Sequence, residues 1–338
     1  MIDLRSDTIT RPTPEMLEVM FSAQVGDDVF EDDPSVNALQ EKIAVLFGME
    51  AALFCPSGTM TNQIAMRINT VPQDEVICDQ YAHIYLYEGG GMMSNSMISP
   101  KLLPGDKGRL SAEMIADSIN PEDVHRPRTS LVALENTMNK GGGAIYDFNE
   151  IQKISQVCRE HGLKLHLDGA RLFNALAETK ETPSDYGQIF DTISICFSKG
   201  LGAPIGSALL GTNKAIKQAK RVRKALGGGM RQAGYLAAAC IYSLDHHIIR
   251  LAEDHHRAKM LGLIIQNLDY VLKVYPIQTN IIIFELQPGV NPIELLEKLK
   301  AKGLLAIGFG KGMLRLVTHL DFDDESLEKA IAIFKSIA

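Results

Sequence analysis

The stretch Thr192-Ile193-Ser194-Ile195-Cys196-Phe197-Ser198-Lys199-Gly200-Leu201-Gly202 decides the fold of this chain. Its first six residues are uncharged and rich in apolar and β-branched side chains, which predicts a buried strand. The glycines behind them mark a turn. Lys199 therefore lies just after the carboxyl end of the predicted strand, where the glycines that follow allow the backbone to bend. A lysine enclosed in an apolar site becomes an amine nucleophile, although most lysines in such places extend to water.

A second apolar run, residues 163–167, ends at Asp168, and Arg171 follows three residues later. The carboxyl ends of parallel strands form the edge where open α/β sheets bind ligands, so we expect Asp168 beside Lys199. A lysine that forms an imine and an aspartate that keeps a pyridine nitrogen protonated are what pyridoxal phosphate requires. Arg171 would then reach the ring oxygen or a substrate carboxylate. Taken alone, Asp168 is equally typical of a helix N-cap, and Arg171 of a surface ion pair with Asp168 or Glu178.

Two other segments supply what a phosphorylated aromatic cofactor needs. Ser57-Gly58-Thr59 follows a short apolar run and opens a helix-like segment. Such a turn offers free N–H groups, the positive end of a helix dipole and two hydroxyls to a phosphate, although an ordinary capped helix has the same pattern. His83 follows the predicted strand Glu75–Asp79 at the same sheet edge. A lone histidine is more often structural, but this position favours a role at the site.

Motifs that span nearly the whole chain occur in the order of a known family. They are Asp3-Leu4-Arg5-Ser6-Asp7-Thr8, Gly26-Asp27-Asp28-Val29, Ser57-Gly58-Thr59, Glu135-Asn136-Thr137, Asp168-Gly169-Ala170-Arg171, Ser198-Lys199-Gly200-Leu201, Gly227-Gly228-Gly229-Met230-Arg231-Gln232 and Arg315-Leu316-Val317-Thr318-His319. The ordered set resembles the low-specificity L-threonine aldolases, which belong to the aspartate-aminotransferase-like pyridoxal phosphate enzymes. The resemblance implies retro-aldol cleavage of L-threonine and L-allo-threonine to glycine and acetaldehyde, with broad tolerance for β-hydroxy-α-amino acids.

The resemblance also assigns roles to residues of this chain. The residues implied as catalytic are Lys199, which carries the Schiff base, His83, His125 and Asp168. Those implied to bind the cofactor are Ser57, Gly58, Thr59, His83, Asp168, Arg171, Lys199, Lys224 and Arg231, with Lys224 and Arg231 reaching a neighbouring subunit's site. Those implied to bind the substrate are Ser6, Arg171, Arg315 and Tyr87. The base that takes the β-hydroxyl proton stays open between His83, His125 and a bound water.

Two segments depart from the family pattern. The family's Glu-Asn-Thr-His-Asn run has Met138 in place of its histidine. If that histidine is a base or proton relay in the family, Met138 cannot replace it. The family's Gly-Asp-Asp-Val-Tyr-Gly segment ends in Phe30 and Glu31 here, which removes a phenol and a glycine from a turn.

The order of elements predicts an α/β enzyme. Strand-like and helical segments alternate from about Leu39 to about Leu244, which indicates a mostly parallel sheet with helices on both faces. After Ile248 the pattern changes to a long helix and a smaller α+β unit. We therefore expect a large cofactor-binding α/β domain over residues 1–250 and a small α+β domain over residues 251–338. The resemblance places the first dozen residues against the small domain.

Composition limits the partners. The net charge of −7 in 338 residues argues against nucleic-acid binding. Five scattered cysteines without a C-x-x-C pair suit a reducing compartment. There is no signal-peptide pattern and no apolar run that would span a bilayer. These features predict a cytoplasmic protein that binds no membrane. The resemblance implies a homo-oligomer, a dimer of dimers with sites shared between subunits, that takes a small amino-acid substrate.

Two clusters of metal-ligand residues are interpreted as structural. The acidic segment 27–33 is typical of a solvated loop and a helix N-terminus, with cation binding left open. His247 and His255 would lie about 12 Å apart along one helix, too far for a single ion with bonds of about 2 Å. We expect no resident metal. From the residues alone, a β-eliminating pyridoxal phosphate lyase and a non-catalytic anion-binding or regulatory module remain alternatives.

Overall fold

The predicted strand before Lys199 is β7 (Thr192–Cys196). In the computed structural model, which describes residues 1–337, β7 lies inside a seven-stranded sheet. The strand order is β2 (Ala51–Cys55), β8 (Ser207–Gly211), β7, β6 (Lys164–Gly169), β5 (Thr129–Glu135), β3 (Glu75–Asp79) and β4 (Ser99–Leu103). Within this sheet β8 alone runs antiparallel to its neighbours. The α/β fold with a mostly parallel sheet is therefore confirmed.

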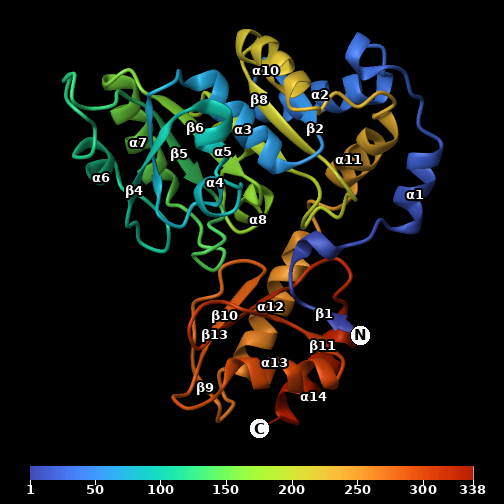
Figure 1. Ribbon diagram of the computed structural model, residues 1–338. Helices are drawn as coiled ribbons and strands as arrows, with labels where there is room; N and C mark the ends of the chain where they lie inside the picture. Colours follow the sequence, from blue (N-terminus) through green and yellow to red (C-terminus); the bar gives the residue numbers. More distant parts are fainter. Residues whose placement is uncertain (338) are drawn as a thin grey trace.

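Helices cover both faces of this sheet (Figure 1). On one face, α2 (Pro34–Phe47), α7 (Phe148–Glu160) and α11 (Gly234–His246) contribute to the largest hydrophobic cluster. On the other, α3 (Gly58–Asn69), α5 (Gly91–Ser96) and α10 (Asn213–Ala225) bury a second cluster. Burial on both faces explains why the strands read as continuous apolar runs. The shorter helices are α1 (Pro14–Phe21), α4 (His83–Leu86), α6 (Ala112–Ala116), α8 (Leu172–Leu176) and α9 (Pro183–Gly187).

A smaller part lies below the large sheet in Figure 1. Its antiparallel sheet has the order β12 (Ile307–Gly308), β13 (Met313–Val317), β10 (Ile281–Leu286) and β9 (Val271–Val274), and it packs with α12 (Leu251–Ile265), α13 (Pro292–Ala301) and α14 (Asp324–Lys335). At the start of the chain, β1 (Ile2–Asp3) pairs in parallel with β11 (Leu304–Leu305) of this part. The small part has its own core cluster, which favours the division into domains near residue 250. That boundary stays a prediction.

The acidic segment 27–33 is used within the fold. Asp27 accepts a backbone N–H of the short turn Asp28–Phe30, and Asp33 caps the N-terminus of α2. Asp28 is buried and pairs with Arg223 at 2.8 Å. Glu31, at the position where the family pattern has glycine, adopts the left-handed conformation with φ of 63°. The turn therefore survives without the glycine.

The prediction that His247 and His255 share one helix is wrong. Helix α11 ends at His246 and α12 begins at Leu251, so the two residues lie on either side of a turn. His247 Nδ1 bonds the Leu201 carbonyl at 2.7 Å, and His255 bonds Glu178 and Asn174. Both imidazoles thus connect elements of the core.

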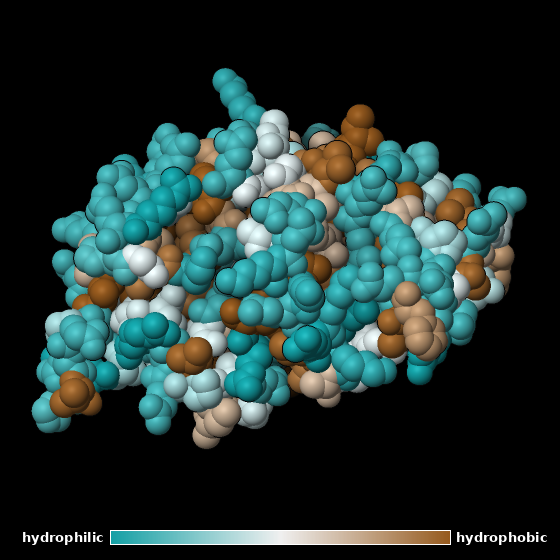
Figure 2. All heavy atoms as spheres, turned by 90° about the horizontal axis from the view of Figure 1, so that it is seen from above, coloured by the Kyte–Doolittle hydropathy of each residue, from teal (hydrophilic) through white to brown (hydrophobic). Residues whose placement is uncertain are grey.

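The surface of the described chain has neither a membrane-spanning helix nor, in the view from above, a broad apolar face. Among the described helices, none combines the length and the apolar character needed to cross a membrane. Seen from above, the large part is mostly hydrophilic, and its hydrophobic side chains are scattered (Figure 2). The five cysteines are buried and free within the described chain.

Candidate active site

Four ionisable side chains gather where the parallel strands end. Asp168 lies near the end of β6, Lys199 just after β7, Glu135 at the end of β5 and His83 after β3. These are neighbouring strands, so their carboxyl ends form one edge, which faces the small part (Figure 1). The strand-end argument from the sequence named Lys199, Asp168 and His83 at this edge, and Glu135 was not among its candidates.

Asp168 is fixed by two neutral donors. Its Oδ2 accepts from Asn62 Nδ2 at 2.8 Å, and its Oδ1 accepts from the Ala170 N–H at 3.1 Å. Asn62 is in turn oriented by His166, whose Nε2 lies 3.1 Å from Asn62 Oδ1. Burial lowers the pKa of His166 to about 4, so this imidazole is neutral at pH 7. Within residues 1–337 both hydrogen bonds to this carboxylate come from neutral groups. Asn62 gave no sequence signal beyond its place in a helix.

The N-terminus of α3 forms the expected anion cradle. Ser57 caps the helix, accepting the Met60 N–H at 3.2 Å. The N–H groups of Gly58 and Thr59 have no acceptor among the described residues. A Cβ on Gly58 would lie 2.6 Å from Cys196 Sγ, so only glycine lets α3 approach β7 this closely. Two free N–H groups and the exposed hydroxyls of Ser57 and Thr59 suit a phosphate.

His83 is held by two carboxylates that the sequence reasoning missed. Its backbone N–H donates to Glu135 Oε2 at 2.8 Å, and its Nδ1 lies 3.0 Å from Glu88 Oε1. Burial alone would lower the pKa of His83, but the bond to Glu88 and the nearby Asp168 and Glu135 raise it. Burial and Asp168 raise the pKa of Glu135 itself to about 7.

Glu88 joins His83 to the Asp168 cluster. It accepts from Asn62 at 2.8 Å and from Gln63 at 2.6 Å. His83, Glu88 and Asp168 offer ligand atoms within 4.8 Å of one another, a spacing that would also suit a cation. Because amide groups and His83 already engage the two carboxylates, we interpret the cluster as a hydrogen-bonded support.

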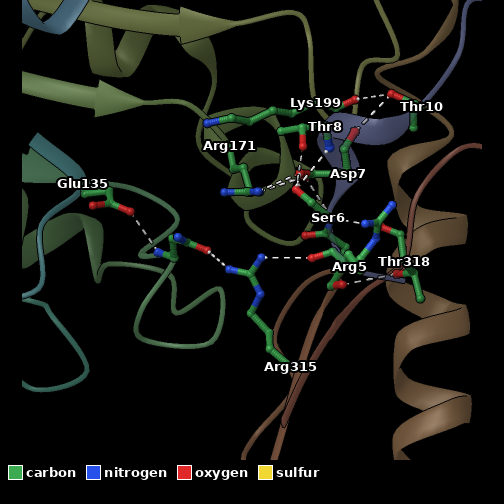
Figure 3. A network of polar contacts seen from close by, with 12 residues as sticks. Arg5, Ser6, Asp7, Thr8, Thr10, Glu135, Arg171, Lys199, Arg315 and Thr318 are labelled. Carbon is green, nitrogen blue, oxygen red and sulfur yellow. Dashed lines mark hydrogen bonds and ion pairs between the residues drawn. The ribbon is translucent and has the colours of Figure 1, made fainter. Parts of the chain in front are cut away.

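Arg171 is not in a surface ion pair with Asp168 or Glu178; that alternative is wrong. Its guanidinium is buried and binds Asp7 in a two-point pair, Nε to Oδ2 at 2.7 Å and Nη2 to Oδ1 at 2.6 Å (Figure 3). Burial would raise the pKa of Asp7, but Arg171, helped by Lys199, holds it down at about 2. Asp7 stands in the quoted motif, but only its neighbour Ser6 was given a role.

Arg315 reaches the site from β13. Its Nη1 donates to Asn139 at 2.7 Å and its Nη2 to the Arg5 carbonyl at 3.1 Å (Figure 3). Its Nε is buried without a partner among the described residues. Burial and the nearby Arg171 lower the pKa of Arg315 to about 10, which leaves it charged at neutral pH. A buried guanidinium with an unused N–H suits a carboxylate ligand.

Ser6 and Tyr87 lie beside these groups. Ser6 caps the short turn Asp7–Ile9 and accepts from the Thr8 hydroxyl at 2.9 Å. The ring of Tyr87 lies 5.6 Å from that of His83 and is half exposed. Both positions are compatible with contact to a substrate.

The structure does not bring the three remaining predicted residues into this cluster. His125 precedes β5, at the opposite edge of the sheet from Asp168; its side chain is 86% exposed and bonds Asp123. Lys224 is exposed at the end of α10, and Arg231 pairs with Asp27 at 2.8 Å. Within one chain these residues lie apart from Lys199.

Met138, the replacement for the family histidine, is a packing residue. Its side chain is fully buried, and a Cβ on Gly108 would lie 2.5 Å from its terminal methyl. The position therefore contributes apolar contacts, while its neighbour Asn139 carries the polar contact to Arg315.

The donor set fits pyridoxal phosphate. Lys199 offers the amine, Asp168 the pyridinium partner and the free N–H groups of Gly58 and Thr59 the phosphate cradle, all at one sheet edge. The Nε of Arg315 is the buried donor left for a carboxylate. The fold and the site define a pyridoxal phosphate enzyme of the aspartate-aminotransferase-like, fold type I class.

Comparisons with known proteins give the family. Residues 3–287 match the beta-eliminating lyase family. The chain is 42% identical over 337 residues to the low specificity L-threonine aldolase of Escherichia coli K12, with 99% of each chain covered. It is 37% identical to low-specificity L-threonine aldolase 1 of Arabidopsis thaliana, covering 99% of this chain and 95% of that one. The chain belongs to the beta-eliminating lyase family and, within it, to the low-specificity L-threonine aldolases.

Solved structures agree on the fold. A threonine aldolase from Leishmania major superposes with a TM-score of 0.86 at 23% identity, over 100% of this chain and 99% of that one. A serine palmitoyltransferase from Sphingomonas wittichii gives a TM-score of 0.75 at 18% identity, over 99% and 86% of the two chains. At these identities the likeness establishes the fold alone.

Proposed function

We propose that this protein cleaves L-threonine and L-allo-threonine to glycine and acetaldehyde, and accepts other β-hydroxy-α-amino acids. The observation that carries the proposal is the placement of Lys199 and Asp168 on neighbouring strand ends, with Asp168 fixed by Asn62. Pyridoxal phosphate, when bound, supplies the electron sink for the carbanion that Cα–Cβ cleavage leaves.

The residues proposed to hold the cofactor are Lys199, Asp168, Gly58, Thr59 and Arg171, with His83 against the ring. Asp7 keeps the Arg171 side chain in place through the two-point pair. Arg315 and Ser6 are proposed to bind the substrate carboxylate. Fixing that carboxylate sets the rotation about Cα and so selects which of its bonds breaks.

His83 is the proposed base. Its Nδ1 is bound to Glu88, which leaves Nε2, without a partner among the described residues, to accept the β-hydroxyl proton directly or through a water. As that proton leaves, the hydroxyl oxygen forms the aldehyde carbonyl and the Cα–Cβ bond breaks. His125 lies at the other sheet edge of the same chain, which favours His83.

Product analysis tests the proposed reaction. Purified protein supplied with pyridoxal phosphate and L-threonine should form glycine and acetaldehyde in equal amounts. Release of ammonia and 2-oxobutyrate would instead assign the β-eliminating activity that the family name suggests. Absence of both product pairs, with the cofactor shown to be bound by its absorbance, would contradict both reactions.

We also propose a homo-oligomer, a dimer of dimers, in which Lys224 and Arg231 complete a neighbour's cofactor site. Both are exposed in the single chain and lie near the Gly227-Gly228-Gly229 turn, remote in sequence from Lys199. Shared sites require a self-complementary interface. In support, Phe21 and Phe30 are 83% and 71% exposed, as expected for side chains that a second copy covers.

Subunit mixing tests the shared site. Lys199→Ala and Arg231→Ala should each be inactive alone, and hybrids should regain activity because one of their sites is intact. No recovery after demonstrated subunit exchange, or a fully active monomer in light scattering, would contradict the proposal.

The proposed location is the cytoplasm. Five buried, free thiols in the described chain suit a reducing compartment. Fractionation of cells that express the tagged protein tests this, and recovery from a secreted or membrane fraction would contradict it.

A further inference from the structure

The ammonium group of Lys140 contacts two aromatic rings at the boundary between the large and the small part. Its Nζ lies 4.2 Å from the centroid of Phe309 in the small part and 5.7 Å from that of Tyr87 in the large part. No carboxylate within the described chain forms an ion pair with it. The aromatic contacts hold the ammonium in place and leave its charge uncompensated.

This cation lies at the substrate end of the site. Tyr87 stands against His83, with ring centroids 5.6 Å apart. The residue next to Lys140, Asn139, bonds Arg315, whose guanidinium carbon lies 5.8 Å from the same Phe309 ring. Two cations therefore flank one aromatic ring, one of them proposed to bind the substrate's α-carboxylate. Threonine offers the other cation, Lys140, no anionic group to bind, since its side chain ends in a methyl group and a hydroxyl.

The space beside Lys140 fits a larger polar group. A hollow of about 460 Å³ opens there, lined among others by Lys140, Lys107, Tyr81, Tyr275 and Phe309. None of the described residues that line it is acidic. An anionic group in this hollow would meet the positive charge of Lys140 and no carboxylate of the lining, which are favourable surroundings for a carboxylate ligand.

We propose that Lys140 binds an anionic substrate side chain and that the preferred class is β-hydroxy dicarboxylic α-amino acids, of which β-hydroxyaspartate is the simplest. The inference rests on the proposed retro-aldol function. The β-hydroxyl proton goes to the base, the Cα–Cβ bond breaks, its electron pair stays on Cα, and Cα is reprotonated. β-Hydroxyaspartate thus yields one glycine and one glyoxylate, with no oxidant or co-substrate.

Paired kinetics test the assignment of Lys140. The wild-type enzyme should cleave L-β-hydroxyaspartate with a kcat/KM above that for L-threonine. Lys140→Gln should lower kcat/KM for the dicarboxylate by about tenfold, the effect of losing a charged hydrogen-bonding partner, while threonine changes by less than about twofold. Lys107→Gln, which changes a more exposed lysine of the same hollow, is the matched control and should leave the ratio unchanged.

Two amino acids that cannot be cleaved test binding separately from the reaction. L-Aspartate carries the second carboxylate and L-2-aminobutyrate the methyl group, and neither has the β-hydroxyl that cleavage needs. As inhibitors of threonine cleavage, L-aspartate should bind more tightly than L-2-aminobutyrate, and Lys140→Gln should abolish that preference. Melting temperatures of the variants exclude a folding defect.

The outcomes separate the two proposals. Threonine cleavage with no preference for either dicarboxylate, or a preference that Lys140→Gln leaves intact, overturns the role of Lys140 and leaves the aldolase function standing. Failure to cleave threonine overturns the aldolase function itself.

Discussion

Asp168 and Arg315 lie at opposite ends of the site, and different kinds of contact hold their side chains in place. Asp168 is held by Asn62 and the Ala170 N–H, all within the large sheet and the helix packed on it. Arg315 comes from the small sheet and is held by Asn139 of the large part and by the Arg5 carbonyl of the N-terminal segment. The contacts of Asp168 therefore depend on the large sheet and one helix packed against it, whereas those of Arg315 require three segments of the chain to meet.

This difference separates the expected effects of mutations. Changes around Asp168 should act on chemistry with the cofactor bound. Changes around Arg315 should act on substrate affinity and on the docking of the two parts.

Asp168→Ala should reduce threonine turnover about a thousandfold or more, since a neutral pyridine stabilises a carbanion poorly. Cofactor binding, followed by absorbance, should persist. Asp74→Ala is the matched control, because Asp74 is also a buried carboxylate but pairs with Arg128 before β3, at the opposite sheet edge. A near-normal kcat in Asp168→Ala would remove the proposed role.

Arg315→Gln should raise KM for threonine roughly a hundredfold with a smaller change in kcat, because a charge-assisted contact to the substrate carboxylate is lost. Arg257→Gln, which removes an arginine that pairs with Asp324 in the small part, should leave KM unchanged. A fall in kcat alone would place Arg315 in the chemical step and contradict its proposed role in substrate binding.

Asp7→Asn should change the acid dependence of stability. The pKa of Asp7 is lowered to about 2 from its ordinary 3.8, so its contribution is present above about pH 4 and lost as pH falls toward 2. That contribution is roughly 2 kcal/mol. Urea unfolding between pH 7 and 3 should show a flatter profile for Asp7→Asn, and Asp324→Asn, at an exposed pair, should follow the wild type. Parallel profiles for Asp7→Asn and the wild type would contradict the buried pair.

Glu88→Gln should lower the pKa of His83, since burial then acts against a weaker hydrogen bond and only Asp168 and Glu135 supply negative charge. NMR titration of the imidazole in cofactor-free protein measures this pKa, and the acidic limb of the kcat/KM profile should move to lower pH if neutral His83 is the base. Glu113→Gln, on the surface, is the control. An unchanged or raised pKa would contradict the support by Glu88.

The strand pattern alone indicated residues at the cofactor end, whereas Arg315, Ser6 and Tyr87 at the substrate end came only from the resemblance, for a physical reason. Lys199, Asp168 and His83 follow apolar strands, and parallel strands bring their carboxyl ends together. Asn62 and Glu88 gave no such signal, because a buried amide or acid becomes recognisable only when its partner is known.

Long-range pairs set the remaining contacts. Asp7 and Arg171 are 164 residues apart, and their pairing depends on how the N-terminal segment crosses to the site. His125 shows the converse. The resemblance gave it a role, but its position before β5 places it at the amino end of the strand, away from the site of its own chain. Lys140 has a visible role only once Tyr87 and Phe309 are seen on either side of it.

The central claim is that Lys199 carries pyridoxal phosphate at the edge where Asp168 and the Gly58–Thr59 cradle meet. Borohydride reduction of the purified holoenzyme, followed by proteolysis and mass spectrometry of the peptides, tests it most directly. A pyridoxyl group is expected on Lys199 and on no other lysine. A pyridoxyl group on a different lysine, or none in protein that shows the cofactor's absorbance before reduction, would contradict it.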